Sequence, residues 1–285
     1  MRVAAILVPF RDEPAQNRAA HLHHLLLALP PVLDAAAGSE WGWRILVGVQ
    51  GHDGRKFSRG RVLNALFLLA QRSLGADLHR VVLHDVDLVP SLDRARGYFL
   101  PMPPRARVLA LNATGEYVGG LGVYIGGICA LDPHTFEGVD GFPNAFEGWG
   151  GEDDALRDRV GGPAAVSVYV PGDVRNLEED PEFARPEHVR ARQTPRFKMP
   201  KEDRLAVRRL GAGAPGLRDL RFCARRRAEA APCVAVFDLD VSLLVPAGWE
   251  MHWSRGSGLP YYVCPASRVC AWRPPTPYPS SASPQ

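Results

Sequence analysis

The chain of 285 residues is 46% hydrophobic and 23% charged, which is enough apolar material for a large core and excludes wholesale disorder. Its formal net charge is only +3, and no basic stripe of the kind that nucleic-acid binding requires stands out. No apolar stretch approaches the roughly 20 residues of a transmembrane helix and no secretory signal peptide is recognisable, so we expect the chain as given to be soluble. Five widely spaced cysteines without a CxxC pair indicate neither a zinc site nor a disulfide framework.

The N-terminal third alternates between expected strands and helices. Apolar runs predict buried strands at 3–10, 43–49 and 81–84, and helical periodicity predicts helices between them, the second over 59–74. We expect the first helix to end at the pair Pro30-Pro31, because proline interrupts helical hydrogen bonding. This alternation is typical of a mostly parallel sheet with helices on both faces, and such sheets bind ligands beyond the carboxyl ends of their strands.

The rest of the chain is richer in loops. We expect a strand over about 123–131, a helix that begins near Asp153, and shorter strands at 165–170 and 234–239. The C-terminal segment crowds several aromatic side chains before a Pro/Ser tail, which indicates a second, very small module.

Two carboxylates, Asp85 and Asp87, follow the third expected strand. Alternate residues of an extended chain face the same side, so both acids can face one cavity. Two close carboxylates repel each other unless a positive group lies beside them, and a hard divalent cation prefers oxygen ligands. The pair therefore predicts a metal site, with a solvated strand end as the alternative.

Segment 148–154, with the sequence GWGGEDD, is the most informative part of the chain. Glycines around Trp149 allow the backbone to approach a ligand closely, and its aromatic face suits the C–H edge of a sugar ring. The three acids begin an expected helix, whose positive dipole end stabilises carboxylates. One of them can act as a general base on an acceptor hydroxyl; an acid-rich helix start after a flexible loop is the alternative.

Five motifs follow one another along the chain in a particular order. They are VPFR at 8–11, FSRGRVLN at 57–64, HDVD at 84–87, YIGG at 124–127, and GFPN followed by GWGGEDD over 141–154. In this order they resemble the β-1,4-galactosyltransferase family, glycosyltransferase family 7. The resemblance covers about 3–241 and implies a GT-A nucleotide-diphospho-sugar transferase fold. The stretch 231–240 is most similar to the xylosylprotein 4-β-galactosyltransferase branch.

The resemblance implies an inverting transfer of galactose from UDP-galactose to a sugar hydroxyl of a glycan in a β-1,4 linkage. Asp153 is then the catalytic base, Glu152 contacts the galactose, and Asp154 contacts the acceptor. Arg196 and Phe197 match a late Arg-Phe pair of the family and are further acceptor candidates. The implied donor site comprises Pro9, Phe10, Arg11, Arg18, Phe57, Arg59, Asp85, Val86, Tyr124, Gly126, Gly127 and Trp149.

The implied metal, Mn²⁺ or Mg²⁺, exposes a departure from the family. Asp87 is the implied ligand, but the family's histidine from a later loop has no counterpart over 173–181. Oxygen ligands from Asp173, Asn176 or Glu178 can replace it, His188 is a further alternative, and a weakened or absent metal site is the last. Other departures are the extra residues 12–16 before Arg18, Glu147 in place of a tryptophan, and Ala155 in place of an aspartate.

The C-terminal segment resembles a WW domain, which gives an expected division into 1–242, 243–277 and a Pro/Ser tail at 278–285. The resemblance implies a three-stranded antiparallel sheet with a proline-rich, PPxY-like peptide as partner. One face would bury Trp249, Tyr262, Pro246 and Pro275, and the other would expose a ligand groove made by Tyr261, Val263, Cys270 and Trp272.

These observations lead to one favoured function and two alternatives. The favoured one is a UDP-galactose-dependent β-1,4-galactosyltransferase that carries a WW adaptor. The alternatives are transfer of N-acetylgalactosamine on the same scaffold, against which Tyr124 argues because the family associates tyrosine here with galactose, and a catalytically weak scaffold that acts through the WW module. The cellular compartment and the acceptor sugar are left open.

Overall fold

The computed structural model describes residues 1–52, 54–112, 123–184, 198–227, 232–241, 248–257 and 259–272. The main sheet contains β1 (Arg2–Phe10), β2 (Trp41–Gln50), β3 (Leu78–His84), β5 (Val108–Ala110), β6 (Ile128–Leu131), β7 (Val166–Val168), β9 (Cys223–Arg226) and β10 (Val234–Asp240). A short sheet pairs β4 (Leu88–Pro90) with β8 (Val174–Asn176), and a third consists of β11 (Glu250–Trp253), β12 (Pro260–Cys264) and β13 (Val269–Ala271). The helices are α1 (Arg18–Ala37), α2 (Arg59–Leu74), α3 (Leu92–Arg96), α4 (Pro133–Gly138), α5 (Glu152–Arg159) and α7 (Lys201–Leu210). Short 3₁₀ turns occur at Pro14–Gln16, Gly75–Asp77, Pro163–Ala165, Gly211–Gly213 and Leu217–Asp219.

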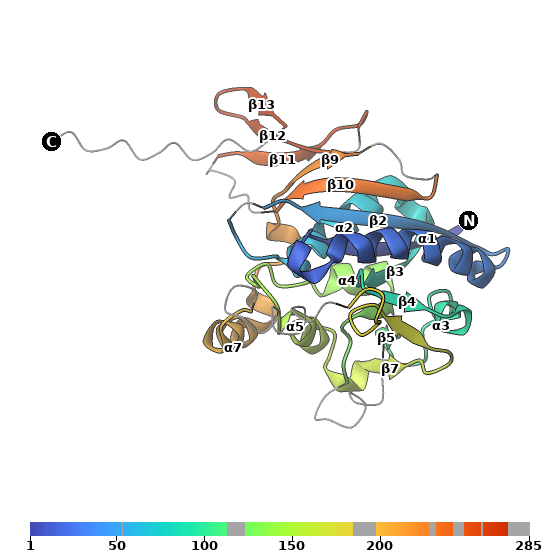
Figure 1. Cartoon of the computed structure of the whole chain (residues 1–285). Helices are drawn as coiled ribbons and strands as arrows, with labels where there is room; N and C mark the ends of the chain where they lie inside the picture. The colour runs from blue at the N-terminus through green and yellow to red at the C-terminus, as the bar shows by residue number, and fades with distance from the viewer. Residues whose placement is uncertain are drawn as a thin grey trace.

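The main sheet has the strand order β7-β5-β6-β3-β1-β2-β10-β9, and in Figure 1 its strands run across the view one above another with α1 in front of them. The central pairs β1–β2, β1–β3 and β2–β10 are parallel, as is β5–β7. Strand β6 is antiparallel to β3 and β5, and β9 is antiparallel to β10. The expected mixed, mostly parallel α/β sheet is therefore confirmed at its centre, and the antiparallel pairs lie toward its two ends.

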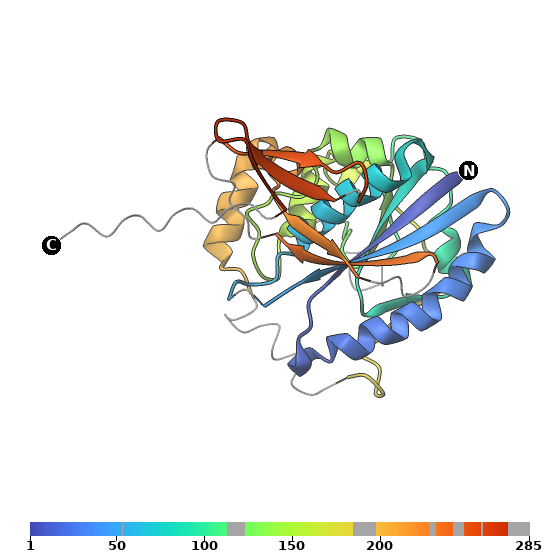
Figure 2. The ribbon, with the colours of Figure 1, turned by 90° about the horizontal axis from the view of Figure 1, so that it is seen from above.

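Two helices cover the centre of the sheet from opposite faces, as Figure 2 shows from above. On one face, Leu25 and Leu29 of α1 pack in a cluster with Ile6, and on the other, Leu66 of α2 packs in a cluster with Leu7. Adjacent residues of β1 thus enter different cores, because successive side chains of a strand point to opposite faces. This arrangement explains why β1 is an unbroken apolar run and not an alternating one.

Helix α1 contradicts the expected stop at Pro30-Pro31, since it continues through both prolines to Ala37. Each proline removes one helical hydrogen bond donor. Beyond them, Leu33 and Ala37 extend the buried row that begins with Leu25 and Leu29 at four-residue spacing. Burial of these side chains outweighs the lost hydrogen bonds, so tertiary packing decides the helix end here.

The expected strand over 123–131 is shorter in the structure, where only Ile128–Leu131 is β6. Pairing between β6 and β3 ends at Ile128 and His84. Immediately before it, Gly127 adopts a left-handed φ of 78°, which turns the backbone out of the sheet. Residues 123–127 therefore run as a loop beside the end of β3.

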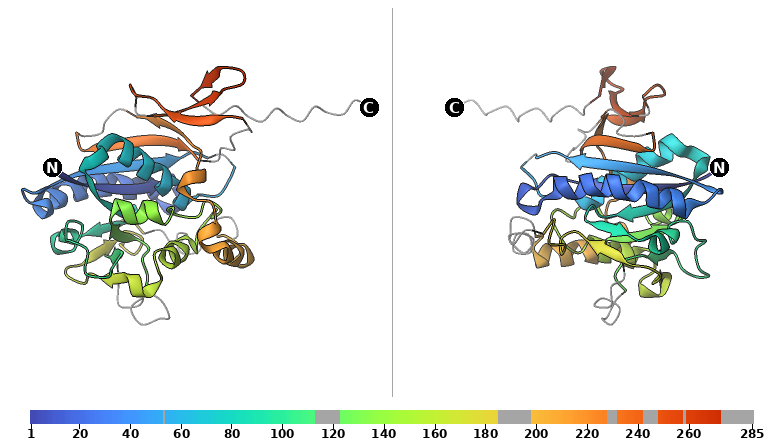
Figure 3. Two further views of the ribbon diagram at one scale, coloured as in Figure 1. Left: turned by 180° about the vertical axis from the view of Figure 1, so that it is seen from behind. Right: turned by 45° about the vertical axis from the view of Figure 1, so that its right-hand side comes forward.

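The C-terminal three-stranded sheet stands over the β9 edge of the main sheet in both views of Figure 3. Its antiparallel order β11-β12-β13 agrees with the expected topology, while assignment to the WW family stays a prediction. The fully buried Tyr262 attaches it to the larger part: its hydroxyl donates to the Phe222 carbonyl at 2.6 Å and accepts from the Phe222 amide at 2.9 Å. The expected boundary near 242 and the residues Pro246 and Pro275 lie outside the described residues.

Candidate active site

Two arginines gather five carboxylates beyond the carboxyl ends of β1 and β3. Arg59, the first residue of α2, donates to Asp85 after β3 and to Asp153 in the first turn of α5, both at 2.7 Å. Its guanidinium is also 3.9 Å from Glu152. This one side chain therefore joins the HDVD and GWGGEDD motifs.

Burial dominates the electrostatics around Arg59. Desolvation disfavours its charge, but Asp153, Asp85 and Glu152 more than compensate and raise the pKa of Arg59 well above its ordinary value. Burial, with repulsion from Asp87 and Asp153, raises the pKa of Asp85 to about 6 against the lowering effect of Arg59. Burial and the neighbouring Asp153 likewise raise the pKa of Glu152 to about 7. The site thus carries more negative charge than its two arginines neutralise.

Tyr124 and Asp153 converge on Gly126. A Cβ on Gly126 would collide with the Tyr124 hydroxyl and lie 2.5 Å from the Asp153 carboxylate. Burial, followed by the nearby Asp153 and Asp85, raises the pKa of Tyr124, so its hydroxyl stays protonated as a hydrogen-bond donor. Only glycine fits between these two side chains, which explains Gly126 of the YIGG motif. Gly127 is required for a different reason, its left-handed φ of 78°.

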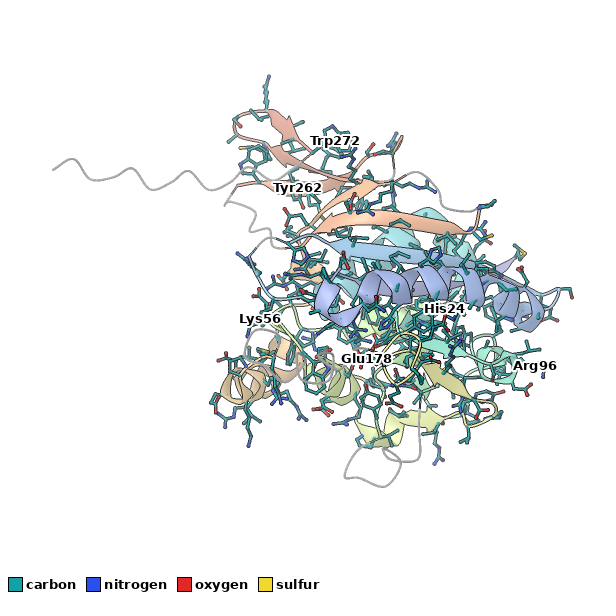
Figure 4. All side chains as sticks on the ribbon, viewed as in Figure 1. His24, Lys56, Arg96, Glu178, Tyr262 and Trp272 are labelled. Atoms are coloured by element: carbon teal, nitrogen blue, oxygen red, sulfur yellow. The ribbon has the colours of Figure 1, made fainter. Side chains whose placement is uncertain are left out.

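The second arginine, Arg18, holds the other acidic group. It begins α1, and its guanidinium lies 2.7 Å from Asp87 and 2.6 Å from Glu178. The extra residues before Arg18 include the turn Pro14–Gln16, which is followed by a left-handed Asn17 directly before the helix. Figure 4 places Glu178 beneath α1.

The remaining candidate donor residues lie at the ends of β1, β2 and β3. Pro9 and Phe10 are buried in the last positions of β1, and Val86 is buried after β3. Arg11 donates to the Arg55 carbonyl at 2.7 Å and so bridges the loops after β1 and β2. The Phe57 carbonyl accepts from the Gly148 amide at 2.8 Å, which fixes the start of the GWGGEDD segment against the loop before α2.

Trp149, which the resemblance placed in the donor site, has a side chain that is 49% exposed. Lys198 lies over its ring at 5.4 Å from the centroid. Asp154 pairs with Arg157 at 3.0 Å and lies 3.9 Å from Arg208. Arg196, Phe197 and His188 lie outside the described residues.

The two departures in the GWGGEDD region have local explanations. Glu147, in the place of a tryptophan, forms an ion pair with Arg61 at 3.2 Å and lies 3.7 Å from Arg55. Ala155 is buried in α5 and packs in a small cluster with Phe146.

On the outer face of the C-terminal sheet, the rings of Tyr261 and Trp272 lie 5.9 Å apart and His252 lies 5.7 Å from Tyr261. Val263 and Cys270 are directly opposite each other on β12 and β13. The groove beside these rings has a volume of about 610 Å³ and is lined in part by Tyr261, Cys270 and Trp272. Tyr262 faces the main sheet while Trp272 faces outward (Figure 4).

Comparison with known proteins identifies the family. Residues 1–98 match the family model for the N-terminal region of glycosyl transferase group 7, and residues 112–167 match the one described as the N-terminal domain of galactosyltransferase. The chain belongs to the glycosyltransferase group 7 family.

Individual relatives of this glycosyltransferase chain are named β-1,4-galactosyltransferases. Human β-1,4-galactosyltransferase 4 is 40% identical over 156 residues, and mouse β-1,4-galactosyltransferase 5 is 36% identical over 186 residues. These matches cover 55% and 64% of this chain but only 42% and 44% of the relatives, so the chain spans less than half of their length.

Among solved structures, the catalytic domain of Drosophila β-1,4-galactosyltransferase 7 has a TM-score of 0.59 at 19% identity. The alignment covers 86% of this chain and 96% of that one, which shows the same GT-A-like fold. The Drosophila protein has been solved with xylobiose, and a mutant of it with manganese, UDP-Gal and xylobiose.

The metal that this family suggests can be tested against the residues present. Asp87 and Glu178 converge on one cation, the Arg18 guanidinium, and carboxylate oxygens are what a hard divalent ion accepts. Asp173 directly precedes β8, and its amide donates to the Ser91 hydroxyl. The Asn176 side chain donates to Glu179 and accepts from the Glu178 amide. The described part of the chain contains no group of three or more His, Cys, Asp or Glu side chains that could together hold a metal ion. The structure thus brings one of the three loop candidates, Glu178, to Asp87, and the pair fits a divalent ion chemically.

The sequence interpretation missed several side chains of this glycosyltransferase site. It assigned Arg18 to the donor site and overlooked its bridge between Asp87 and Glu178, since no periodicity connects residues so far apart. It also missed Lys56 and Arg204, which approach the Trp149 segment.

None of the helices in the described ranges has both the length and the apolar character needed to cross a bilayer.

Proposed function

We propose that the protein is a β-1,4-galactosyltransferase that moves galactose from UDP-galactose to a sugar hydroxyl of a glycan. The observation that carries the proposal is Arg59, which holds Asp85 and Asp153 on a single guanidinium at 2.7 Å each. Asp85, a residue of the implied donor site, and Asp153, the expected catalytic base, therefore lie together at the edge of the sheet where α/β proteins bind ligands. The names of the relatives and of the Drosophila complexes support the donor.

The chemistry is a single displacement with inversion. Asp153 accepts the proton of the acceptor hydroxyl, whose oxygen forms a bond to C1 of galactose on the face opposite the diphosphate. The bond from C1 to the β-phosphate oxygen breaks, and its electron pair leaves with UDP. Glu152 and Tyr124 lie beside Asp153 and are the residues proposed to hold the galactose, while Asp154 and the exposed Trp149 meet the acceptor.

The charge of the site supports a divalent cation in the reaction. Arg18 and Arg59 face Asp85, Asp87, Glu152, Asp153 and Glu178, so the described cluster has an excess of negative charge before a diphosphate enters. Asp87 and Glu178 are the residues that would hold Mn²⁺ or Mg²⁺. Such an ion, when bound, neutralises the departing diphosphate.

Transfer from UDP-galactose tests the proposal. With Mn²⁺ present, UDP release is measured over a panel of N-acetylglucosaminides, glucosides and xylosides, the last because xylobiose occupies the Drosophila relative. We expect turnover that Asp153→Ala or Asp87→Ala abolishes, while Asp93→Ala, an exposed aspartate at the start of α3, leaves it unchanged. Folded protein without turnover on any acceptor contradicts the proposal.

Transfer of N-acetylgalactosamine on the same scaffold is the competing enzymatic function. Tyr124 lies against Gly126 and Asp153 and narrows the space where an N-acetyl group would lie. Rates with UDP-galactose and UDP-N-acetylgalactosamine on one acceptor distinguish the two, and a higher rate with the second donor contradicts the galactose assignment.

The outer groove of the C-terminal sheet supports a second function, binding of a proline-rich segment. Its carrying observation is the pair of neighbouring rings Tyr261 and Trp272, the latter 59% exposed, because aromatic grooves accommodate polyproline-II helices. Titration with a PPxY peptide tests it, with Trp272→Ala expected to abolish binding and Trp41→Ala, on β2, as control. Peptide binding without UDP or Mn²⁺ binding favours the scaffold alternative.

A further inference from the structure

Three basic side chains lie close to the exposed Trp149, which is proposed above to meet the acceptor. The ammonium group of Lys198 lies over the Trp149 ring, and Lys56 donates to the Lys198 carbonyl at 2.7 Å. The Arg204 side chain lies over the two glycines that follow Trp149, with its Cδ 3.2 Å from the position of a Cβ on Gly151. Figure 4 shows Lys56 on the side of the main sheet that carries α5 and α7.

No carboxylate within the described ranges pairs with Lys56, Lys198 or Arg204 at 4.0 Å or less, and the Arg204 Nε is buried without a hydrogen-bond partner. Neighbouring basic residues differ in this respect, since Arg157 and Arg208 are paired with aspartates of α5. Uncompensated positive charge therefore lies on the rim beside Trp149. It contrasts with the acidic excess around Arg59.

We propose that this rim recognises an anionic group on the acceptor, so that the preferred acceptor is an acidic sugar bearing a carboxylate, sulfate or phosphate. Trp149 lies four residues before Asp153, so a sugar ring packed on it can present a hydroxyl to the base while its anionic substituent reaches the ammonium and guanidinium groups. This inference rests on the proposed transferase function and specifies the class of its acceptor. Lysine ammonium and arginine guanidinium are the side chains that carboxylate, sulfate and phosphate oxygens pair with.

Matched acceptor pairs provide the test. Transfer from UDP-galactose is measured on N-acetylglucosaminide with and without 6-sulfate or 6-phosphate, and on glucoside against glucuronide. In at least one of these pairs, we expect kcat/KM at low salt to be about tenfold higher for the anionic acceptor than for its neutral partner. A tenfold difference corresponds to the free energy that several partly solvated charge pairs contribute together. Added salt should reduce the ratio, because it screens exposed charges.

Substitutions locate the effect. Lys198→Met and Arg204→Gln are expected to bring the ratio of anionic to neutral kcat/KM toward one, whereas Arg218→Gln, an exposed arginine whose side chain is 79% accessible, should leave the ratio unchanged. Calorimetric titration with UDP alone tests whether the rim binds the diphosphate of the donor instead. If Lys198→Met weakens UDP binding by the same factor as it lowers the ratio of anionic to neutral kcat/KM, the rim binds the donor and the inference is wrong.

Binding of the same acceptor pairs in the presence of UDP gives a readout independent of turnover. Preferential binding of the anionic member without transfer contradicts the proposed function and supports the inference. Equal binding and equal kcat/KM within every pair overturn the inference even when galactose is transferred.

Discussion

The guanidinium of Arg18 lies 2.7 Å from the Asp87 carboxylate, although 69 positions separate the two residues in the chain. The same guanidinium reaches Glu178 in the loop after β8, where the family's histidine has no counterpart. An arginine therefore holds the two carboxylates that a divalent ion would share. The positions that the fold gives to Arg18, Asp87 and Glu178 therefore bear directly on whether the proposed reaction depends on a metal ion.

Replacing Arg18 tests the relationship. Arg18→Ala leaves Asp87 and Glu178 close together without the cation between them, which we expect to lower stability by about 2–3 kcal/mol and the melting temperature by about 5 °C. Mn²⁺ should restore most of this loss in the variant and stabilise the unchanged protein less. Thermal unfolding with and without Mn²⁺ measures both effects. Arg2→Ala, which removes an exposed pair with Glu40, is the control; an Arg18 variant that Mn²⁺ does not stabilise contradicts the assignment of Asp87 and Glu178 as ligands.

How much of this arrangement could be predicted from the sequence depends on whether a feature is local. The buried strands and α2 follow from apolar periodicity, and the place of Asp85 and Asp87 at the carboxyl edge of the sheet follows from parallel topology. The approach of Asp153 to Asp85 through Arg59 does not follow from it, because α5 comes after the antiparallel strand β6. Helix α1 could not be bounded in this way, because the end of the helix depends on how Leu33 packs beneath the sheet. The contact of Arg18 with Glu178 depends on how β8 pairs with β4, a short non-local ladder that periodicity does not reveal.

Asp153→Asn tests the proposed base. The amide keeps the size of the side chain but does not accept a proton, so we expect kcat to fall about 10² to 10³-fold while the dissociation constant for UDP changes little. Steady-state kinetics and calorimetry measure the two quantities. Asp158→Asn, on the same helix and 44% accessible, serves as the matched control. A variant that retains full kcat shows that another group takes the proton.

Gly126→Ala probes the space between Tyr124 and Asp153. The added methyl would lie 2.5 Å from the Asp153 carboxylate and collide with the Tyr124 hydroxyl, so both side chains must move. We expect at least about a tenfold fall in kcat, because small displacements of reacting groups are costly. Gly138→Ala, where a Cβ meets nothing within 4 Å, should behave like the unchanged protein. Equal activity of both variants contradicts the placement of Tyr124 and Asp153 at the reacting centre.

Glu152 predicts an unusual dependence of stability on pH. Its pKa is raised from 4.5 to about 7 by burial and by Asp153, so the folded protein retains a proton that the unfolded chain releases between these values. Stability is therefore expected to fall as pH rises from about 5 to about 8. Glu152→Gln should flatten this dependence and raise the melting temperature at pH 8 by about 5 °C. Melting temperatures across the pH range measure it, with the exposed Glu137→Gln as control; identical slopes in the two variants contradict the prediction.

Tyr262 predicts how the C-terminal sheet depends on the larger part of the molecule. Tyr262→Phe keeps the buried ring but removes the hydroxyl that bonds to both the amide and the carbonyl of Phe222. Two buried backbone groups then lose a partner, which we expect to cost about 1–3 kcal/mol of docking free energy. Faster proteolysis between β10 and β11 would reveal the loosened attachment, measured beside galactose transfer, which should persist. Tyr261→Phe, the adjacent position on the outer face, is the matched control. If both variants are cleaved at the rate of the unchanged protein, the sheet does not depend on the Tyr262 hydroxyl for its attachment.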